Sequence, residues 1–233
     1  MQAPEFNRLN ADSLIADSLI ANSLNECKQA VCRYSSIVFP PASCYYIPYG
    51  TVHCAAGQSA VPTAGYRIFL ITMIKILCIG KMKDKALQAL SSEYVRRISA
   101  FTRVEIIEVK DESNAHAERE AEASRIKDSE AERALGRLRD PDLVVLLDLD
   151  GRMWDSEGFA CRLKDWQQLA GQKGGDLVFV IAGSLGPGTA LKKRADLRWK
   201  LSDLTFTHLM TRVLILEQIY RGFMILNGRT YHK

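Results

Sequence analysis

The sequence predicts an α/β domain with three layers, in which a mostly parallel sheet lies between two layers of helices. From Met73 onward, strand-like and helix-like segments alternate along the chain, which is typical of βαβ units. Two of the strand-like segments, 143–149 and 177–182, are nearly continuous apolar runs, as expected for strands buried on both faces of a parallel sheet. A long apolar helix near the end of the sequence is wide enough to pack against more than one neighbour.

The first half of this domain begins with a strand. The segment IKILCIG at 74–80 has the composition of a buried strand, and 85–98 has the period of a helix. A second strand, RVEIIEVK, is expected at 103–110. The charged, alanine-rich segment 115–139 then predicts a long helix.

The second half holds the candidate binding loops. A helix at 155–170 separates the two apolar strands, and a glycine loop, a short helix and a short edge-like segment at 197–201 follow them. Ligands bind outside the carboxyl ends of the strands in parallel sheets of this kind. The loops after Leu147, Ala182 and Leu201 therefore form the candidate site.

The final helix is expected to begin after a polar loop, 201–207, and to end near Asn227. Thr205 or Thr207 can serve as its N-cap, and Gly228 is placed to terminate it. Its apolar positions recur at intervals of three and four residues and spread over a wide face. They are Leu209, Met210, Val213, Leu214, Ile215, Leu216, Ile219, Tyr220, Phe223 and Met224. A core together with a dimer interface would cover such a face.

The chain changes character near Met73. Residues 1–72 contain three near-copies of a pentad at 11–25, and proline, glycine and serine interrupt 39–65, so we expect a poorly ordered extension or translated upstream sequence. The body at 73–233 carries 27 basic and 23 acidic residues, a mild surplus that permits an RNA partner. No apolar run approaches the roughly 18–20 residues of a membrane span, and no signal peptide is evident.

The sequence lacks the motifs that are typical of several enzyme classes. The loop at 183–188, GSLGPG, follows a buried strand but matches neither the dinucleotide-binding fingerprint nor the P-loop. A nicotinamide Rossmann enzyme and a P-loop NTPase are therefore disfavoured. The sequence also lacks a zincin motif, a nucleophile elbow and a paired metal-ligand cluster, so no metal is expected.

Several dispersed blocks carry a family resemblance. They are IKI followed by GK at 74–81, LDLDG at 147–151, VFVIAGSLG at 178–186, LSDLTFTH at 201–208, RVLILEQIYRG at 212–222 and the terminal YHK. Together they resemble the bacterial 23S rRNA pseudouridine N3-methyltransferase family, the RlmH type of the SPOUT class, over about 73–233. The resemblance implies a C-terminal trefoil knot, a cytoplasmic homodimer, S-adenosyl-L-methionine as methyl donor and the ribosome as substrate.

The resemblance also implies which residues contact the methyl donor. The matching positions are Leu147, Ala182, Gly183, Gly186, Leu201, Ser202, Asp203, Leu204, Thr205 and Phe206. The family usually has glycine where this chain has Ala182, and proline where it has Thr207. The added methyl group would crowd the donor if φ were positive at Ala182, and the missing proline would loosen the start of the helix.

The catalytic candidates lie at the end of the chain. Methyl transfer to an imide nitrogen needs a proton acceptor and a group that stabilises charge on the flanking carbonyl oxygens. His232 is the candidate acceptor or substrate orienter, because its side chain titrates near neutral pH. Arg221, Arg229 and Lys233 are nearby cations, and Tyr231 can stack on a splayed base. Alternatively, Arg221 only pairs with Glu217, and Tyr231 only packs the tail.

Two rival functions remain open at this stage. The chain could be a non-catalytic ribosome-binding module in which Ala182 has abolished donor binding, or another SPOUT enzyme that methylates a ribose hydroxyl or a tRNA base. Because the body surplus is only +4, we expect the assembled ribosome, not free rRNA, to be the substrate.

Overall fold

The structure is a computed structural model that describes residues 72–113, 119–229 and 231. The chain divides into two units, Met1–Ile68 and Phe69–Lys233, and the described residues belong to the second. The predicted poorly ordered extension, up to residue 71, lies outside the described residues. Within the described part, no helix is both long and apolar enough to cross a membrane.

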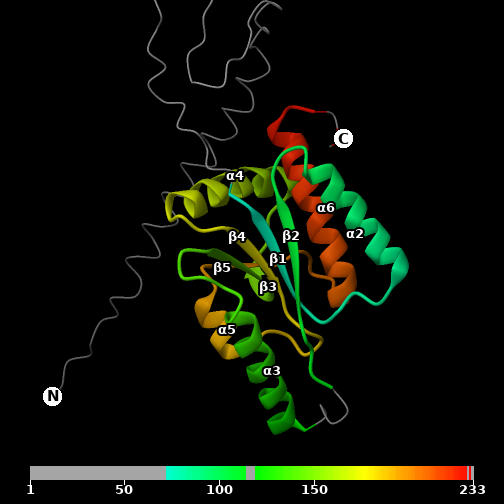
Figure 1. The fold of residues 1–233 in the computed structure, drawn as a ribbon, viewed down its shortest axis with the longest axis vertical. Coiled ribbons are helices and arrows are strands. Elements are labelled where there is room, and N and C mark those ends of the chain that lie inside the picture. Colours follow the sequence, from blue (N-terminus) through cyan, green and yellow to red (C-terminus); the bar gives the residue numbers. More distant parts are fainter. Residues whose placement is uncertain (1–71, 114–118, 230, 232–233) are drawn as a thin grey trace, which may run out of the picture. The chain divides into compact units, whose positions relative to one another are not determined.

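A five-stranded parallel sheet forms the centre of the second unit (Figure 1). Its strands are β1 (Ile74–Ile79), β2 (Val104–Val109), β3 (Leu143–Arg152), β4 (Leu177–Ile181) and β5 (Leu197–Trp199), in the spatial order β2-β1-β4-β3-β5. The most apolar strands lie inside this order, and β4 is buried at all five of its residues. The prediction of a mostly parallel sheet is therefore confirmed.

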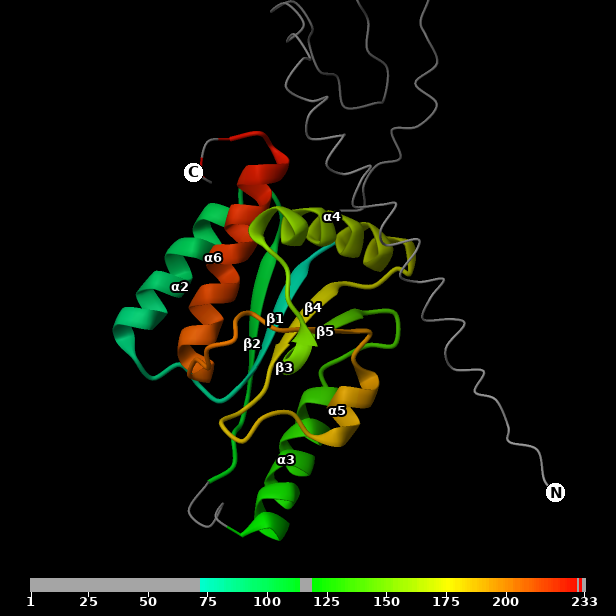
Figure 2. The ribbon, with the colours of Figure 1, turned by 180° about the vertical axis from the view of Figure 1, so that it is seen from behind.

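Helices cover both faces of the sheet (Figures 1 and 2). One face carries α2 (Lys85–Ile98), α4 (Ser156–Gln172) and α6 (His208–Leu226), and the other carries α3 (Glu120–Leu135) and α5 (Thr189–Arg194). Alternate residues of each strand point to opposite faces. Val145 and Phe179 accordingly join the core beneath α4 and α6, whereas Val144 and Val178 join the core beneath α3 and α5.

Most predicted elements agree with the structure, and two differ. The prediction that a helix runs over 115–139 was wrong at its C-terminal end, because α3 ends at Leu135 and Gly136 is the C-cap; residues 115–118 lie outside the described residues. Strand β3 continues to Arg152, three residues beyond the predicted 149. Gly151 permits this continuation, since a Cβ there would lie 2.8 Å from the backbone of Arg198 and Trp199 on β5.

Helix α6 is buried on several sides, as its width predicted. It packs against α2 and α4 as well as the sheet. Thr207 is its N-cap, and the Thr207 hydroxyl accepts a hydrogen bond from the Met210 amide at 3.3 Å. Beyond the end of the helix, Gly228 adopts φ +61°, so the expected glycine termination is confirmed.

Candidate functional site

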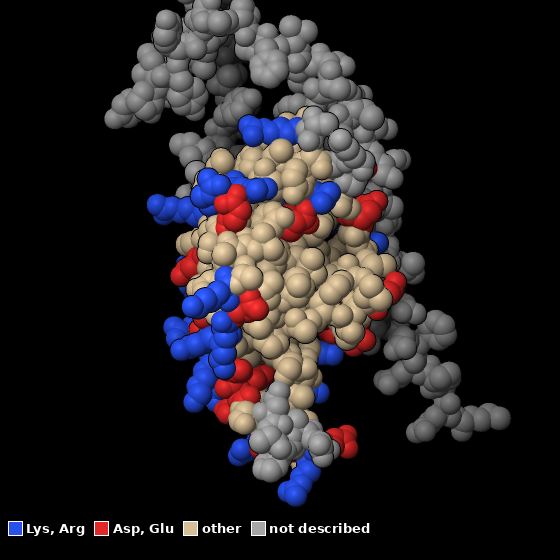
Figure 3. All heavy atoms as spheres, turned by 90° about the vertical axis from the view of Figure 1, so that its right-hand side faces the viewer, with Lys and Arg blue, Asp and Glu red and all other residues tan. Residues whose placement is uncertain are grey.

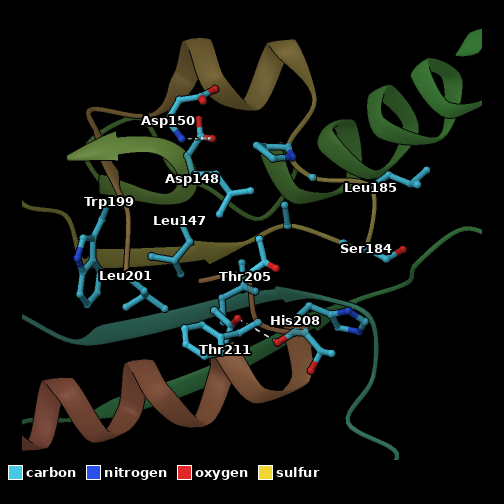
Figure 4. Close-up of a pocket in the computed structure, with 18 of the residues that line it drawn as sticks. Leu147, Asp148, Asp150, Ser184, Leu185, Trp199, Leu201, Thr205, His208 and Thr211 are labelled. Carbon is cyan, nitrogen blue, oxygen red and sulfur yellow. Dashed lines mark hydrogen bonds between the residues drawn. The ribbon is translucent and has the colours of Figure 1, made fainter. Parts of the chain in front are cut away.

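A cavity of about 800 Å³ opens at the carboxyl ends of the central strands (Figure 4). Three segments supply most of its lining: the last part of β3, the loop that follows β4, and the segment from β5 to the first turn of α6. Lys127 of α3 and Lys192 of α5 complete it. The sequence predicted loops after Leu147, Ala182 and Leu201. The second and third are loops, but the prediction of a loop directly after Leu147 was wrong, because residues 147–150 still belong to β3. Ligand pockets in proteins commonly occupy about 300–1,000 Å³, so the cavity can hold a nucleoside-sized molecule.

Nine of the ten residues predicted to contact the methyl donor line this cavity. They are Leu147, Ala182, Gly183, Gly186, Leu201, Ser202, Leu204, Thr205 and Phe206. The tenth, Asp203, is not among the lining residues; its side chain is exposed and pairs with Lys200 at 2.6 Å. The fold thus gathers side chains from three parts of the chain, but their role in binding stays a prediction.

One end of the cavity is apolar. Trp199, Leu147 and Leu201 lie together there (Figure 4), and no motif in the sequence marks Trp199 as part of the site. The Trp199 ring stacks on Phe159 with 4.4 Å between ring centroids, and it is only 3% exposed. Together the rigid aromatic ring and the two leucines form an apolar surface that suits a flat heteroaromatic ring.

Acidic side chains border the same cavity on its β3 side. Asp148 lies 3.5 Å from Lys192 and 3.4 Å from Arg198, and Asp150 also lies 3.5 Å from Lys192. Asp148 is almost completely buried, so these two cations compensate its charge. Carboxylate oxygens held in this way can accept hydrogen bonds from ligand hydroxyls.

The glycine loop accommodates the residue that departs from the family pattern. No described residue other than glycine has a positive φ, so Ala182 takes an ordinary backbone conformation. The condition under which its methyl group would crowd the methyl donor is therefore not met. Gly183 has a different requirement. A Cβ at Gly183 would lie 2.5 Å from Oε2 of Glu130, which is buried beneath the loop. Gly186 has φ +86°, which also favours glycine.

The first turn of α6 closes the other end of the cavity. Thr207 caps the helix in place of the family's proline, so its hydroxyl fixes the helix start that the missing proline was expected to loosen. His208 and Thr211 line the cavity from this turn (Figure 4). Burial lowers the pKa of His208, Arg212 lowers it further, and Asp111 acts in the opposite direction.

A buried arginine lies directly behind His208. Arg212 is 2% exposed, pairs with Glu108 at the end of β2, and donates a hydrogen bond to the carbonyl oxygen of Gly80 at 3.0 Å. The Glu108 carboxylate also accepts the amide hydrogen of Met82 at 2.9 Å. These contacts fix the first turn of α6 against the ends of β1 and β2.

The predicted catalytic residues that the structure describes do not line this cavity. Arg221 and Tyr231 lie toward the C-terminal end of α6, whereas the cavity lies at its N-terminal end. Arg221 pairs with Glu217 at 2.6 Å, and its guanidinium lies 5.0 Å from the centre of the Tyr231 ring. His232, the candidate proton acceptor, lies outside the described residues. The catalytic assignments therefore stay predictions.

The site has no metal-binding character in the part of the chain that the structure describes. No group of three or more histidine, cysteine, aspartate or glutamate residues gathers there. The arrangement offers instead an apolar wall, acidic hydrogen-bond acceptors and a half-buried histidine. Such a site can bind a nucleoside-like ligand and accept a proton beside it.

Comparisons with known proteins agree with the residue blocks in the sequence. A family profile described as "Predicted SPOUT methyltransferase" matches residues 72–232. The ribosomal RNA large subunit methyltransferase H proteins of Latilactobacillus sakei and Ruminiclostridium cellulolyticum are 43% and 44% identical over 160 residues, which are 69% of this chain and 99% of each relative. The corresponding protein of Lactobacillus helveticus is 41% identical over the same length. The match to this family profile and the identity to these relatives show that this chain belongs to the SPOUT methyltransferase family.

Proposed function

We propose that the protein uses S-adenosyl-L-methionine to methylate N3 of a pseudouridine in 23S rRNA, and that it acts in the cytoplasm on the assembled ribosome. The observation that carries this proposal is the gathering of nine predicted donor-binding residues around one cavity. Family membership and relatives named for large-subunit rRNA methylation support the reaction class and the RNA.

The residues of the cavity fit the methyl donor. Trp199, Leu147 and Leu201 would receive the adenine ring, and the backbone of 201–206 would offer amides and carbonyls to its edge. Asp148 and Asp150 would accept hydrogen bonds from ribose hydroxyls. When bound, the donor supplies a methyl group attached to a positively charged sulfur. The chain's own residues must position the acceptor nitrogen, exclude water and receive its proton.

We further infer that the C-terminal segment forms a trefoil knot. Support comes from the family and from the path of the chain after β5. Residues 201–207 return from the edge strand to the last part of β3 and the loop after β4 before α6 begins on the face of the sheet shared with α2 and α4. Such threading brings backbone from distant parts of the sequence around one ligand.

The position of the tail favours a homodimer. Helix α6 has 19 residues, which at about 1.5 Å per residue place its two ends about 28 Å apart. Arg221 and Tyr231 therefore sit far from the cavity of their own chain. A second copy, with its α6 reversed relative to the first, would bring its tail to this cavity. We propose that Tyr231, His232 and Arg221 of one protomer act at the cavity of the other.

The surface of the described residues also supports a second copy of this chain as the partner. Four of the seven exposed large hydrophobic residues, Leu90, Leu204, Phe206 and Met210, lie on α2, on α6 or in the segment before α6. Figure 3 shows that this side of the molecule presents a broad area without charged side chains. An apolar area of this kind commonly marks a protein–protein interface. Sedimentation at micromolar concentration should show a dimer; a fully active monomer would contradict the proposal.

The substrate can be tested with one set of reactions at a single salt concentration. Labelled methyl incorporation should be high with assembled ribosomes and low with separate subunits or naked 23S rRNA, because a surplus of +4 supplies few phosphate contacts. Mapping the methylated nucleotide by mass spectrometry distinguishes base N3 from a ribose hydroxyl. Equal incorporation into naked rRNA would contradict recognition of the particle.

A calorimetric titration addresses the rival binding module. The ordinary φ of Ala182 removes the reason to expect a defect, so the methyl donor and its demethylated product should both bind. NAD should not bind, since the dinucleotide fingerprint is missing. Absence of donor binding together with ribosome binding would favour the non-catalytic module.

A further inference from the structure

We infer that the imidazole of His208 accepts the proton that leaves the nitrogen as it is methylated. This inference rests on the proposed function and names a residue of this chain for one of its steps. His208 is one of four histidines in the sequence, and it lies with His232 in the terminal segment beside the candidate site. Its position in the fold carries the inference.

His208 lies between the cavity and a fixed polar wall. Its imidazole lines the cavity from the first turn of α6, at the end away from Trp199 (Figure 4). Behind it is Gly80, where a Cβ would lie 3.5 Å from Nε2 of His208 and 3.7 Å from Oδ2 of Asp111. The ring therefore has the ligand space on one side, and on the other Gly80 lies between it and the Asp111 carboxylate.

The location within the cavity also fits the step. The apolar end, with Trp199, Leu147 and Leu201, suits the adenine ring and leaves the end near His208, Ser184 and Leu185 for the substrate base. A general base must lie within hydrogen-bond reach of the proton that it removes. Among the described residues that line the cavity, His208 is the only histidine, the side-chain type whose ordinary pKa lies near neutrality.

The charges around His208 keep the ring ready to accept a proton. Burial and the guanidinium of Arg212, one helical turn away, both disfavour the imidazolium and lower the pKa of His208. Glu108 balances Arg212 through an ion pair and holds it in place. Asp111 works in the other direction and would stabilise the imidazolium once it forms. Burial and Arg212 thus favour the uncharged ring, and Asp111 supplies a partly compensating negative charge.

The step balances without another reactant. The nitrogen forms a bond to the methyl carbon, the carbon–sulfur bond breaks with its electron pair going to sulfur, and the N–H proton passes to a ring nitrogen of His208. The imidazolium then returns the proton to solvent. His232 of the tail would in this case orient the substrate base and not act as the acceptor.

The first experiment compares single-turnover methylation of ribosomes by the wild-type dimer and by His208→Gln. The variant should lose about 100-fold or more in rate, while its affinity for S-adenosyl-L-methionine, measured by calorimetry, stays within about two-fold. His232→Gln tests the rival acceptor. The wild-type rate should rise with pH and level off above the lowered pKa of His208. The His208→Gln rate should keep rising, because hydroxide must then remove the proton.

The second experiment does not depend on activity. In the donor-free dimer, the His208 resonance should titrate below 6.5, its ordinary value, and Asp111→Asn should lower the midpoint further. A midpoint above neutral pH would overturn the inference, as would wild-type turnover by a folded His208→Gln variant. If the wild-type protein itself methylates no ribosome, the proposed function fails as well. If the wild-type protein methylates ribosomes rapidly and the His208→Gln variant does so slowly, both the proposed function and the role of His208 are supported.

Discussion

Replacing Gly183 by alanine tests how the loop after β4 is built. The added Cβ would lie 2.5 Å from Oε2 and 3.1 Å from Cδ of Glu130. Because φ at Gly183 is not positive, the backbone itself tolerates alanine, and the clash with Glu130 is the specific cost. Glu130 is 4% exposed, and its other oxygen accepts the Glu112 amide hydrogen at 3.0 Å. The carboxylate must therefore shift and weaken that hydrogen bond.

The magnitude follows from these contacts. Forcing a methyl group into a well-packed site typically costs about 1–3 kcal/mol, and a weakened buried hydrogen bond contributes within that range. For a domain of this size, the same change lowers the unfolding midpoint by roughly 2–4 °C per kcal/mol. If the loop relaxes instead by moving into the cavity, the cost appears as weaker donor binding, about 5- to 150-fold at 1.4 kcal/mol per tenfold.

The assay is a double-mutant cycle with Glu130→Ala, read by thermal unfolding without ligand and by calorimetry with the methyl donor. Gly183→Ala should be destabilised in the wild-type background and much less so beside Glu130→Ala, with a coupling of about 1 kcal/mol or more. Gly183→Val should abolish donor binding. Gly136→Ala, at a glycine with φ −62° where an added Cβ would meet no atom closer than 3.6 Å, controls for alanine substitution without a clash. A Gly183→Ala protein with unchanged stability and affinity, or an additive cycle, would refute this reasoning.

Three further outcomes are expected. A chain of residues 73–233 should fold and bind the methyl donor as the full chain does, measured by circular dichroism and calorimetry; loss of binding would make the extension part of the fold. Burial raises the pKa of Glu130 in the folded protein. Ionisation of Glu130 therefore lowers the free energy of unfolding as the pH rises from its ordinary pKa of 4.5, and the loss is complete above the raised pKa. Glu130→Gln should therefore raise the unfolding midpoint at pH 7 and leave it nearly unchanged near pH 4. Deleting 231–233 should reduce methyl transfer while donor affinity stays nearly constant.

Local patterns predicted the helices and the inner strands well. The predicted helix 85–98 coincides with α2, since Asp84 caps it at 2.9 Å from the Leu87 amide and its last turn carries two arginines. The continuous apolar runs predicted β3 and β4 because strands buried on both faces need no alternation. These features depend only on neighbours in the sequence, so one sequence suffices to find them.

Features that depend on the order of the strands could not be predicted from local patterns. Arg212 sits on an apolar helix face, and its partner Glu108 is 104 residues earlier in the chain, so neither spacing nor composition reveals the pair. The requirement for glycine at position 183, in the loop after β4, arises from Glu130 on α3. The position of His208 beside Gly80, at the end of β1, depends on how α6 packs on the sheet. The family resemblance supplied the binding loops, but not these supports.

The distance between cavity and tail yields a decisive mixing experiment. Gly183→Val should disable the cavity of its own chain and leave its tail intact, and deletion of 231–233 should do the reverse. Each homodimer should be inactive. Mixed and reassembled in equal amounts, half of the dimers are heterodimers, and each then holds one cavity completed by an intact tail from its partner. Activity should return to about a quarter of the wild-type value per chain, as expected for a two-fold symmetric pair. If each tail served its own cavity, the mixture would stay inactive, because no chain would carry both an intact cavity and an intact tail.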